Sequence, residues 1–175
     1  MHRALWANVK SFFRPRTPLI EVLQGLPLFA QLSLRQLQEV ERIVHLRTYR
    51  GGEVIFHMGD PGVAMYVILA GEVRVVLPGE TPEDEVELAR LGAGELFGEL
   101  ALLDSSPRSA TVIAATPTEA AALARPDWMN LIHRRPDIGV AMLLPLAQLL
   151  SARLRATTRL QYEAERTSNV EKERT

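Results

Sequence analysis

Short runs of apolar and β-branched residues, separated by turns, occupy the middle of the chain. The runs cover 46–49, 54–57, 65–69, 73–77, 86–91, 110–114 and 119–123. Most of the 11 glycines lie between Gly51 and Gly98, where they suit turns that need a positive φ. Turn signals spaced about 8–12 residues apart predict a sandwich or barrel of antiparallel strands.

A helical pattern precedes these strands. Its apolar positions, Leu34, Leu37, Val40 and Val44, recur at steps of three and four residues. Ser33 stands directly before them and is a residue type that caps helix N-termini through its side-chain oxygen. We therefore expect a helix that begins after Ser33.

Two more helices are expected after the strands. Pro126 and Asp127 start a short one that ends near Ile132, and Pro136 occupies the first position of a longer one. An apolar stripe along the longer helix is expected to pack against the barrel or a partner. The stripe consists of Leu143, Leu146, Leu150 and Leu154.

Pro145 lies inside the longer helix. Because proline lacks an amide hydrogen and clashes with the preceding turn, we expect a kink near Ala141. The basic, aromatic segment 1–17 is expected to pack on its own domain, on a partner or on anionic lipid. We expect 18–160 to form the folded domain and the polar tail 161–175 to be a helical extension or frayed.

Composition excludes several classes of protein. Hydrophobic residues make up 47% of the chain and charged residues 23%, as in ordinary soluble globular domains. The chain has no cysteine and no two histidines at metal-ligand spacing, so we expect no disulfide, metal or cofactor. The net charge of −1 argues against a dedicated nucleic-acid binder.

No membrane-spanning segment is expected. The longest apolar stretch, 140–150, is about half as long as the ~20 residues that a spanning helix needs. The start of the chain lacks the apolar run and cleavage site of a signal peptide. We therefore expect a cytoplasmic protein.

The segment 97–112, FGELALLDSSPRSATV, has the features of an anion site. Gly98 lets the backbone turn sharply out of a strand, and the residues after it fit a single helical turn with free amides. Arg108 adds a planar fork of donors that suits two phosphate oxygens. Glu99 has the wrong charge for a phosphate, so we expect it to accept from a hydroxyl. The segment predicts a ligand with an anionic end and a hydroxyl end.

This segment resembles the phosphate-binding cassette of cyclic-nucleotide-binding domains, the family of the catabolite activator protein, the protein kinase A regulatory subunits and the cyclic-nucleotide-gated channels. The resemblance extends from about Pro27 to Leu154. LPLFAQLS resembles the helical lead-in, YRGGEVIFHMGDPGVAMYVILAGEVRVV the first half of the barrel, and ATPTEAAALARPDW the last strand and the following helix. It implies a mainly β fold, an antiparallel eight-stranded jelly-roll barrel with N-terminal helices and a C-terminal helix pair.

The resemblance implies a role for each matching residue. Glu99 would accept from the ribose 2′-hydroxyl, and Arg108 would pair with the exocyclic oxygens of the cyclic phosphate. Val75 would contact the base, and Ser109 would reach either the phosphate or a guanine amino group. Backbone amides near Leu100, Ala101, Ser109 and Ala110 would complete the cradle that begins at Gly98.

In this family the last helix also closes over the base, commonly through an arginine, a hydroxyl or an aromatic ring. Counted without gaps, that region falls at 149–153. Some channel-type domains carry an arginine where Leu149 stands, so Arg153, one turn further on, becomes the candidate for this contact. The alternative for Arg153 is plain solvent exposure.

The function that the resemblance implies is a non-enzymatic sensor of cAMP or cGMP that signals by moving its terminal helices. No helix-turn-helix follows the long helix, so we expect a protein partner or a homodimer, and not DNA, to receive the signal. The alternative is a protein-interaction module whose nucleotide pocket is vestigial.

Overall fold

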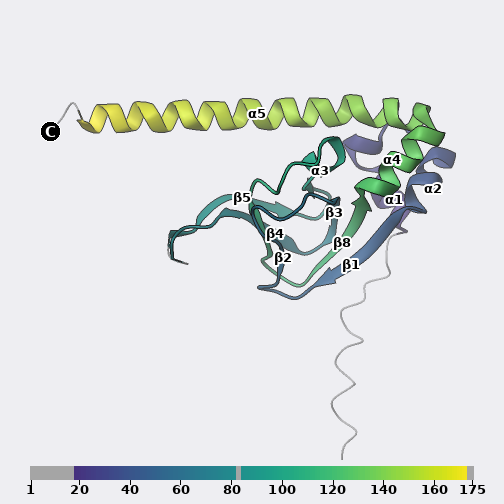
Figure 1. Cartoon of the computed structure of the whole chain (residues 1–175), viewed down its shortest axis with the longest axis horizontal. Helices are drawn as coiled ribbons and strands as arrows, with labels where there is room; N and C mark the ends of the chain where they lie inside the picture. Colours follow the sequence, from purple (N-terminus) through teal and green to yellow (C-terminus); the bar gives the residue numbers. More distant parts are fainter. Residues whose placement is uncertain (1–17, 82–83, 173–175) are drawn as a thin grey trace, which may run out of the picture.

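The computed structural model describes residues 18–81 and 84–172, so the basic segment 1–17 lies outside the described residues. Two four-stranded antiparallel sheets form the centre of the described part (Figure 1). Helices lie at one end of the sheets, and one long helix runs along their side (Figure 1). The expected jelly-roll with flanking helices is confirmed.

The helical elements are α1 (Leu19–Gln24), the 3-10 helix η1 (Pro27–Phe29), α2 (Leu34–Glu41), α3 (Leu100–Leu103), α4 (Arg125–Arg134) and α5 (Pro136–Lys172). The strands are β1 (Val44–Tyr49), β2 (Val54–Phe56), β3 (Ala64–Ala70), β4 (Glu72–Leu77), β5 (Val86–Gly92), β6 (Leu96–Phe97), β7 (Thr111–Ala114) and β8 (Thr118–Ala124). All seven predicted strands are present, with ends that differ by one or two residues.

One sheet has the strand order β1-β8-β3-β6, and the other has the order β2-β7-β4-β5. The eighth strand, β6, is the strand expected before Gly98, but it is missing from the predicted runs because it contains only two residues. Its position is set by pairing with β3, in the register Tyr66↔Phe97 and Val67↔Leu96. This pairing brings the chain directly to Gly98, the start of the predicted anion site.

The N-terminal cap of α2 follows the prediction. The Ser33 hydroxyl oxygen accepts from the Gln36 amide at 3.4 Å, and the Gln36 side-chain oxygen accepts from the Ser33 amide at 2.8 Å. This reciprocal capping box satisfies two amides that a helix start otherwise leaves free. Caps of this kind stabilise a helix by about 1 kcal/mol.

The apolar face predicted for α2 is only half correct. Leu37 and Val40 are fully buried, but Leu34 is 56% exposed and Val44 belongs to β1. The helix ends at Glu41, and the chain then enters the sheet, so the helical spacing does not extend to Val44.

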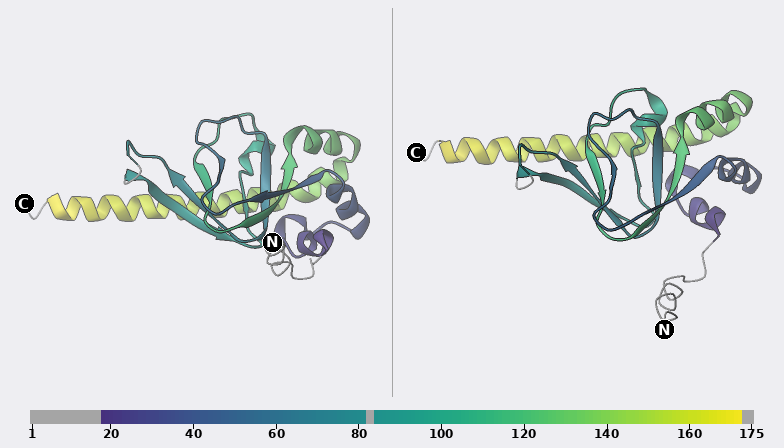
Figure 2. Two further views of the ribbon diagram at one scale, coloured as in Figure 1. Left: turned by 90° about the horizontal axis from the view of Figure 1, so that it is seen from below. Right: turned by 60° about the horizontal axis from the view of Figure 1, so that its bottom comes forward.

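The long helix α5 is continuous from Pro136 to Lys172 and runs through Pro145 without a break. Of the two alternatives for the tail, helical extension is therefore correct as far as Lys172. The bend expected near Ala141 stays a prediction. Figure 2 shows that α5 passes along the two sheets and extends beyond them.

The apolar stripe predicted for α5 is also partly wrong. Leu146 is buried and Leu150 half-buried, but Leu143 and Leu154 are 42% and 68% exposed. Residues four apart lie nearly in line along a helix, so one such row can face the core. The core-facing row consists of Ile138, Met142 and Leu146.

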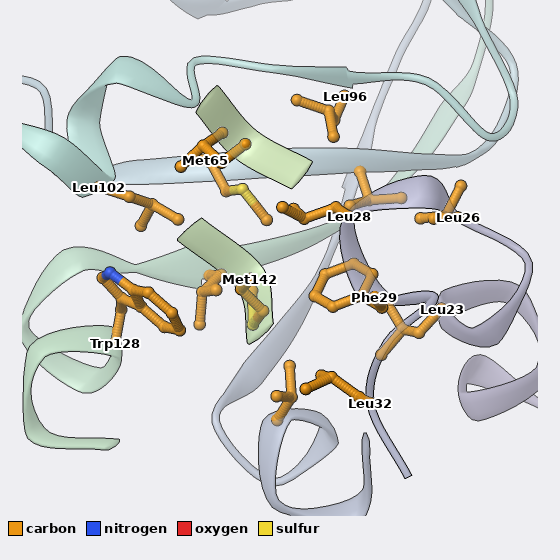
Figure 3. Packing of buried hydrophobic residues seen from close by; sticks show 14 of the residues in the cluster. Leu23, Leu26, Leu28, Phe29, Leu32, Met65, Leu96, Leu102, Trp128 and Met142 are labelled. Atoms are coloured by element: carbon orange, nitrogen blue, oxygen red, sulfur yellow. The ribbon is translucent and has the colours of Figure 1, made fainter. Parts of the chain in front are cut away.

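The largest group of buried side chains fastens the beginning of α5 to the rest of the domain. Met142 of α5 lies between Trp128 of α4 and Phe29 of η1 (Figure 3). Each of these three side chains is 1% exposed. Met65 of β3 belongs to the same cluster, so the helices and the first sheet share one core.

One segment of α5, Pro136–Arg159, is long and apolar enough to cross a membrane by length and composition. The sequence prediction, which considered only 140–150, did not anticipate this. Ile138, Met142 and Leu146 of the same segment are 2% exposed or less. Packing in the core therefore accounts for the apolar character of one face of the helix.

Candidate ligand-binding site

A cavity of about 360 Å³ is bounded by the second sheet, by the segment 97–110 and by α5. Its volume is in the range of small-molecule sites. The structure brings all the sequence-predicted site residues together around it. They are Val75, Gly98, Glu99, Leu100, Ala101, Arg108, Ser109, Ala110 and Arg153.

Gly98 makes the turn between β6 and α3 with a φ of +68°, a conformation that side chains other than hydrogen rarely allow. A Cβ atom at this position would lie 2.6 Å from Arg108 Nη1 and 3.3 Å from the Ala64 carbonyl oxygen. Glycine is therefore required twice, for the turn itself and for the close approach of the arginine.

The backbone around Arg108 is fixed by the loop that follows β2. The Arg108 amide donates to the Asp60 carbonyl oxygen at 2.8 Å, and the Arg108 carbonyl oxygen accepts from the Gly59 amide at 2.9 Å. A β-bridge between Pro61 and Pro107 adjoins these bonds. Two segments about 48 residues apart thus hold the arginine at the cavity wall.

The guanidinium of Arg108 is enclosed, and its residue is 7% exposed. Nη2 donates to the Ala64 carbonyl oxygen at 2.7 Å, and Nη1 donates to the Gly98 carbonyl oxygen at 3.1 Å. Nε is buried and has no hydrogen-bond partner. Nε therefore has no acceptor among the described residues, and each terminal nitrogen carries a second hydrogen beyond the one it donates.

The charge of Arg108 is not neutralised by an ion pair within the described residues. Burial lowers the pKa of Arg108 from its ordinary value, whereas Tyr66, Asp60 and Glu99 act in the opposite direction. A buried cation without a counter-ion is costly unless something compensates it. An anion in the cavity would supply that compensation.

Glu99 lies at the start of α3 and is 5% exposed. Its Oε1 accepts from Arg153 Nη1 at 2.6 Å, and Arg153 Nη2 donates to the Leu96 carbonyl oxygen at 2.7 Å. Arg153 is therefore paired within the site although its side chain is 38% exposed, and its expected contact with the base stays a prediction. The carboxylate thus connects the predicted cassette to α5.

The backbone donors are only partly free. The Ala101 amide donates to the Gly98 carbonyl oxygen at 3.2 Å, and the Leu102 amide donates to the Glu99 carbonyl oxygen at 3.0 Å. The predicted donor Ala101 therefore already has an acceptor. The ligand contacts expected from the amides of Leu100, Ser109 and Ala110 stay predictions.

Part of the cavity wall is apolar. Val75 of β4 is joined there by Leu88, Ala89 and Leu91 of β5 and by Val112 of β7. The β5 residues were missed because nothing in their local sequence marks them, although Ala89 is the cross-strand partner of Val75. This apolar wall suits an aromatic base.

Other lining residues were also missed. Phe56 lies in β2, and Ala156 and Thr157 lie on α5. The two α5 residues are three and four positions after Arg153, so helical spacing would have found them. Phe56 had no such signal.

Residues 46–135 match the family model of the cyclic nucleotide-binding domain. The matched range is slightly more than half of the 175 residues and contains both Glu99 and Arg108. The chain belongs to the cyclic nucleotide-binding domain family.

Two relatives illustrate the breadth of the similarity. The cyclic AMP receptor protein of Thermus thermophilus is 40% identical over 136 residues, which are 76% of this chain and 59% of that protein. The cAMP-dependent protein kinase regulatory subunit of Mycosarcoma maydis is 31% identical over 169 residues, 91% of this chain and 31% of that protein. The chain spans less than two thirds of either relative.

Solved structures agree with this assignment. A cyclic nucleotide-binding domain from Methylobacillus flagellatus superimposes with a TM-score of 0.68 at 31% sequence identity. The superposition covers 78% of this chain and 76% of that one. The similarity therefore extends over more than three quarters of each chain.

Proposed function

We propose that this chain is a sensor that binds a cyclic purine mononucleotide, cAMP or cGMP, in the cavity and reports it through α5. Arg108 is the observation that carries the proposal: a buried cation without an ion pair among the described residues, whose Nε is unpartnered. A cyclic phosphate would meet Arg108, the ribose hydroxyl would donate to Glu99, and the base would lie against Val75. Two relatives whose names refer to cAMP support this choice of ligand.

The proposed signal passes through the ion pair of Glu99 and Arg153. Arg153 Nη1 contacts one carboxylate oxygen, Oε1, so a ligand hydroxyl can donate to the other. A ligand that binds best while Arg153 is paired with Glu99 would favour the position of α5 that allows this ion pair. The change in helix position is then a population shift set by that difference in affinity.

The proposed output surface is the side of α5 that faces away from the core. Val140 is 71% exposed, Leu144 56% and Leu154 68%. Exposed apolar side chains that gather along one helix suit contact with another protein. We propose that a protein partner or a second copy of this chain contacts them.

We further propose that the chain acts in the cytoplasm as a binding protein without catalytic activity. The three charged side chains of the cavity, Glu99, Arg108 and Arg153, are each held by other groups of the domain. Glu99 is paired with Arg153, and Arg108 donates to two carbonyl oxygens. Groups held in this way suit recognition of a ligand more than transfer of a proton.

Isothermal titration calorimetry with cAMP, cGMP and a cyclic dinucleotide tests the proposal. We expect one of the two mononucleotides to bind with one site per chain, and the dinucleotide to bind more weakly because it exceeds the cavity. Absence of binding heat for all three at saturating concentration would contradict the proposal. The interaction module with a vestigial pocket would then be the better account.

A further inference from the structure

An aromatic ring covers one face of the Arg108 guanidinium. The Cζ atom of Arg108 lies 4.0 Å from the ring centroid of Phe56 and 5.9 Å from that of Tyr66. A cation over a ring face is attracted by the ring quadrupole, and the attraction grows when the pair is removed from water. Arg108 is 7% exposed, so the pair with Phe56 is largely desolvated.

The Phe56 ring is itself held in place by two further rings. Tyr66 and Phe97 stack with centroids 5.0 Å apart and planes 9° apart. Phe56 lies 6.0 Å from Tyr66 and 5.9 Å from Phe97. Because Phe56 comes from one sheet and the other two rings from the other sheet, this group joins both sheets beneath Arg108.

The ring and the two carbonyl oxygens restrain Arg108 in different ways. The oxygens of Ala64 and Gly98 accept from the two terminal nitrogens. Phe56 restrains the plane of the guanidinium, which those two bonds alone leave free to tilt. With the plane fixed, the unpartnered Nε keeps one direction.

We infer that Phe56 is a positioning residue for the ligand anion: it sets the plane of the Arg108 guanidinium before ligand binds. The inference rests on the proposed function, since the anion is the cyclic phosphate. The benefit is preorganisation, because an arginine that is already ordered need not be immobilised when the ligand binds. Phe56 therefore acts through Arg108.

A merely structural role for Phe56 makes a different prediction. Core packing depends on the size and shape of the ring, whereas attraction of a cation depends on the electron density of the ring face. Fluorination withdraws that density and changes the shape of the ring little. Phe29, which is 1% exposed in the helical core and belongs to a different cluster, provides a matched position for the same changes.

The experiment replaces Phe56 in the full chain with mono-, di- and trifluorinated phenylalanine and measures cAMP affinity by calorimetry, with cGMP in parallel. We expect stepwise weakening with each fluorine, reaching about three- to tenfold for the trifluoro ring, the range expected for immobilising one side chain. The same series at Phe29 should leave affinity unchanged. Thermal denaturation of each variant verifies that it is folded.

The outcomes separate this inference from the function on which it rests. An unfluorinated chain that binds neither cAMP nor cGMP overturns both. A chain that binds with an affinity independent of fluorination at Phe56 overturns the positioning role alone. Equal weakening in the Phe29 series would also overturn it, because the effect would then be one of general packing.

Discussion

Arg153 of α5 donates to Glu99 through Nη1 and Oε1, which are 2.6 Å apart. The two residues are 54 positions apart in the chain. The acid is enclosed, with a side chain 7% exposed, whereas the arginine is 38% exposed. One ion pair thus joins α5 to the wall of the cavity.

Replacing Arg153 by glutamine should weaken cAMP binding by roughly two- to fivefold, a modest effect because the pair is partly exposed. Without the ion pair, α5 would occupy the position that binds ligand best less often. The apparent affinity falls with the fraction of molecules in that position. Calorimetry measures the change. Arg155→Gln, an exposed position on the same helix, is the matched control and should bind as the unaltered chain does. Equal affinity in both variants would remove Arg153 from the account.

Arg108→Ala should weaken cyclic-nucleotide binding by at least ~2 kcal/mol, about thirtyfold, because a charge-assisted contact in an enclosed site is lost. Arg108→Lys should restore only part of the affinity, since the planar fork is absent. The alanine variant should remain folded but melt at a lower temperature, because the carbonyl oxygens of Ala64 and Gly98 lose their donors.

The control for Arg108 is Arg90→Ala on β5, where the side chain is 52% exposed. Its affinity should equal that of the unaltered chain. If Arg108→Ala also bound with unchanged affinity, the anion would have to lie elsewhere in the cavity.

The role of Glu99 is tested through the sugar. If its carboxylate accepts from the ribose 2′-hydroxyl, 2′-deoxy-cAMP should bind the unaltered chain much more weakly than cAMP does. In Glu99→Gln the difference between the two ligands should shrink, because a weaker acceptor replaces a charged one. Competition titrations with both ligands measure this. A variant that loses affinity equally for both would show that Glu99 acts by holding Arg153.

The cassette was predictable because its chemistry is local. Gly98, Glu99 and Arg108 lie within 11 positions of sequence, and a turn, a short helix and a loop suffice to bring them together. The parts of the cavity wall formed by β2 and β5 were not predictable in this way. Phe56 and Ala89 reach the cavity only through the pairing of β2 with β7 and of β5 with β4, which their local sequence does not indicate.

The helix α5 shows a second limit of the sequence. Its apolar positions surround much of the helix, so spacing alone did not identify the row that faces the core. Tertiary packing selects Met142, which the predicted stripe omitted, and leaves Leu154 exposed. Arg153 could be proposed from sequence as a lid residue, but its partner Glu99 could not, because the position of α5 fixes that contact.

The start of α5 is tied to α2 by a group of polar side chains. Asp137 accepts from Arg135 Nη2 at 2.7 Å and from Gln36 Nε2 at 2.8 Å, and Arg135 also pairs with Glu39. The hydrogen bonds from Arg135 first, and from Gln36 second, hold the pKa of Asp137 well below its usual range. A carboxylate with a lowered pKa in the folded state stabilises the fold above its unfolded pKa.

Asp137→Asn should therefore be less stable than the unaltered chain at pH 7, and the gap should narrow as pH falls. The difference in stability should begin to narrow near the ordinary carboxyl pKa of about 4, because Asp137 of the unaltered chain is protonated there in the unfolded state. It should continue to narrow toward the lower folded pKa, below which the folded state is protonated too. Urea denaturation at several pH values between 7 and 3 measures the gap. A gap that is constant over this range would mean that the charge of Asp137 does not contribute.

Hydrogen exchange with and without saturating cAMP tests whether a ligand in the cavity acts on α5, because it locates the ligand and its consequence together. With cAMP bound, we expect slower exchange in the cassette, 97–112, and in the α5 segment 149–158, with little change in the barrel strands far from the cavity. Protection in the cassette alone would mean that ligand binds but α5 does not report it. If exchange in both segments is the same with and without cAMP, at a concentration that saturates calorimetric binding, the proposed site and its link to α5 are contradicted.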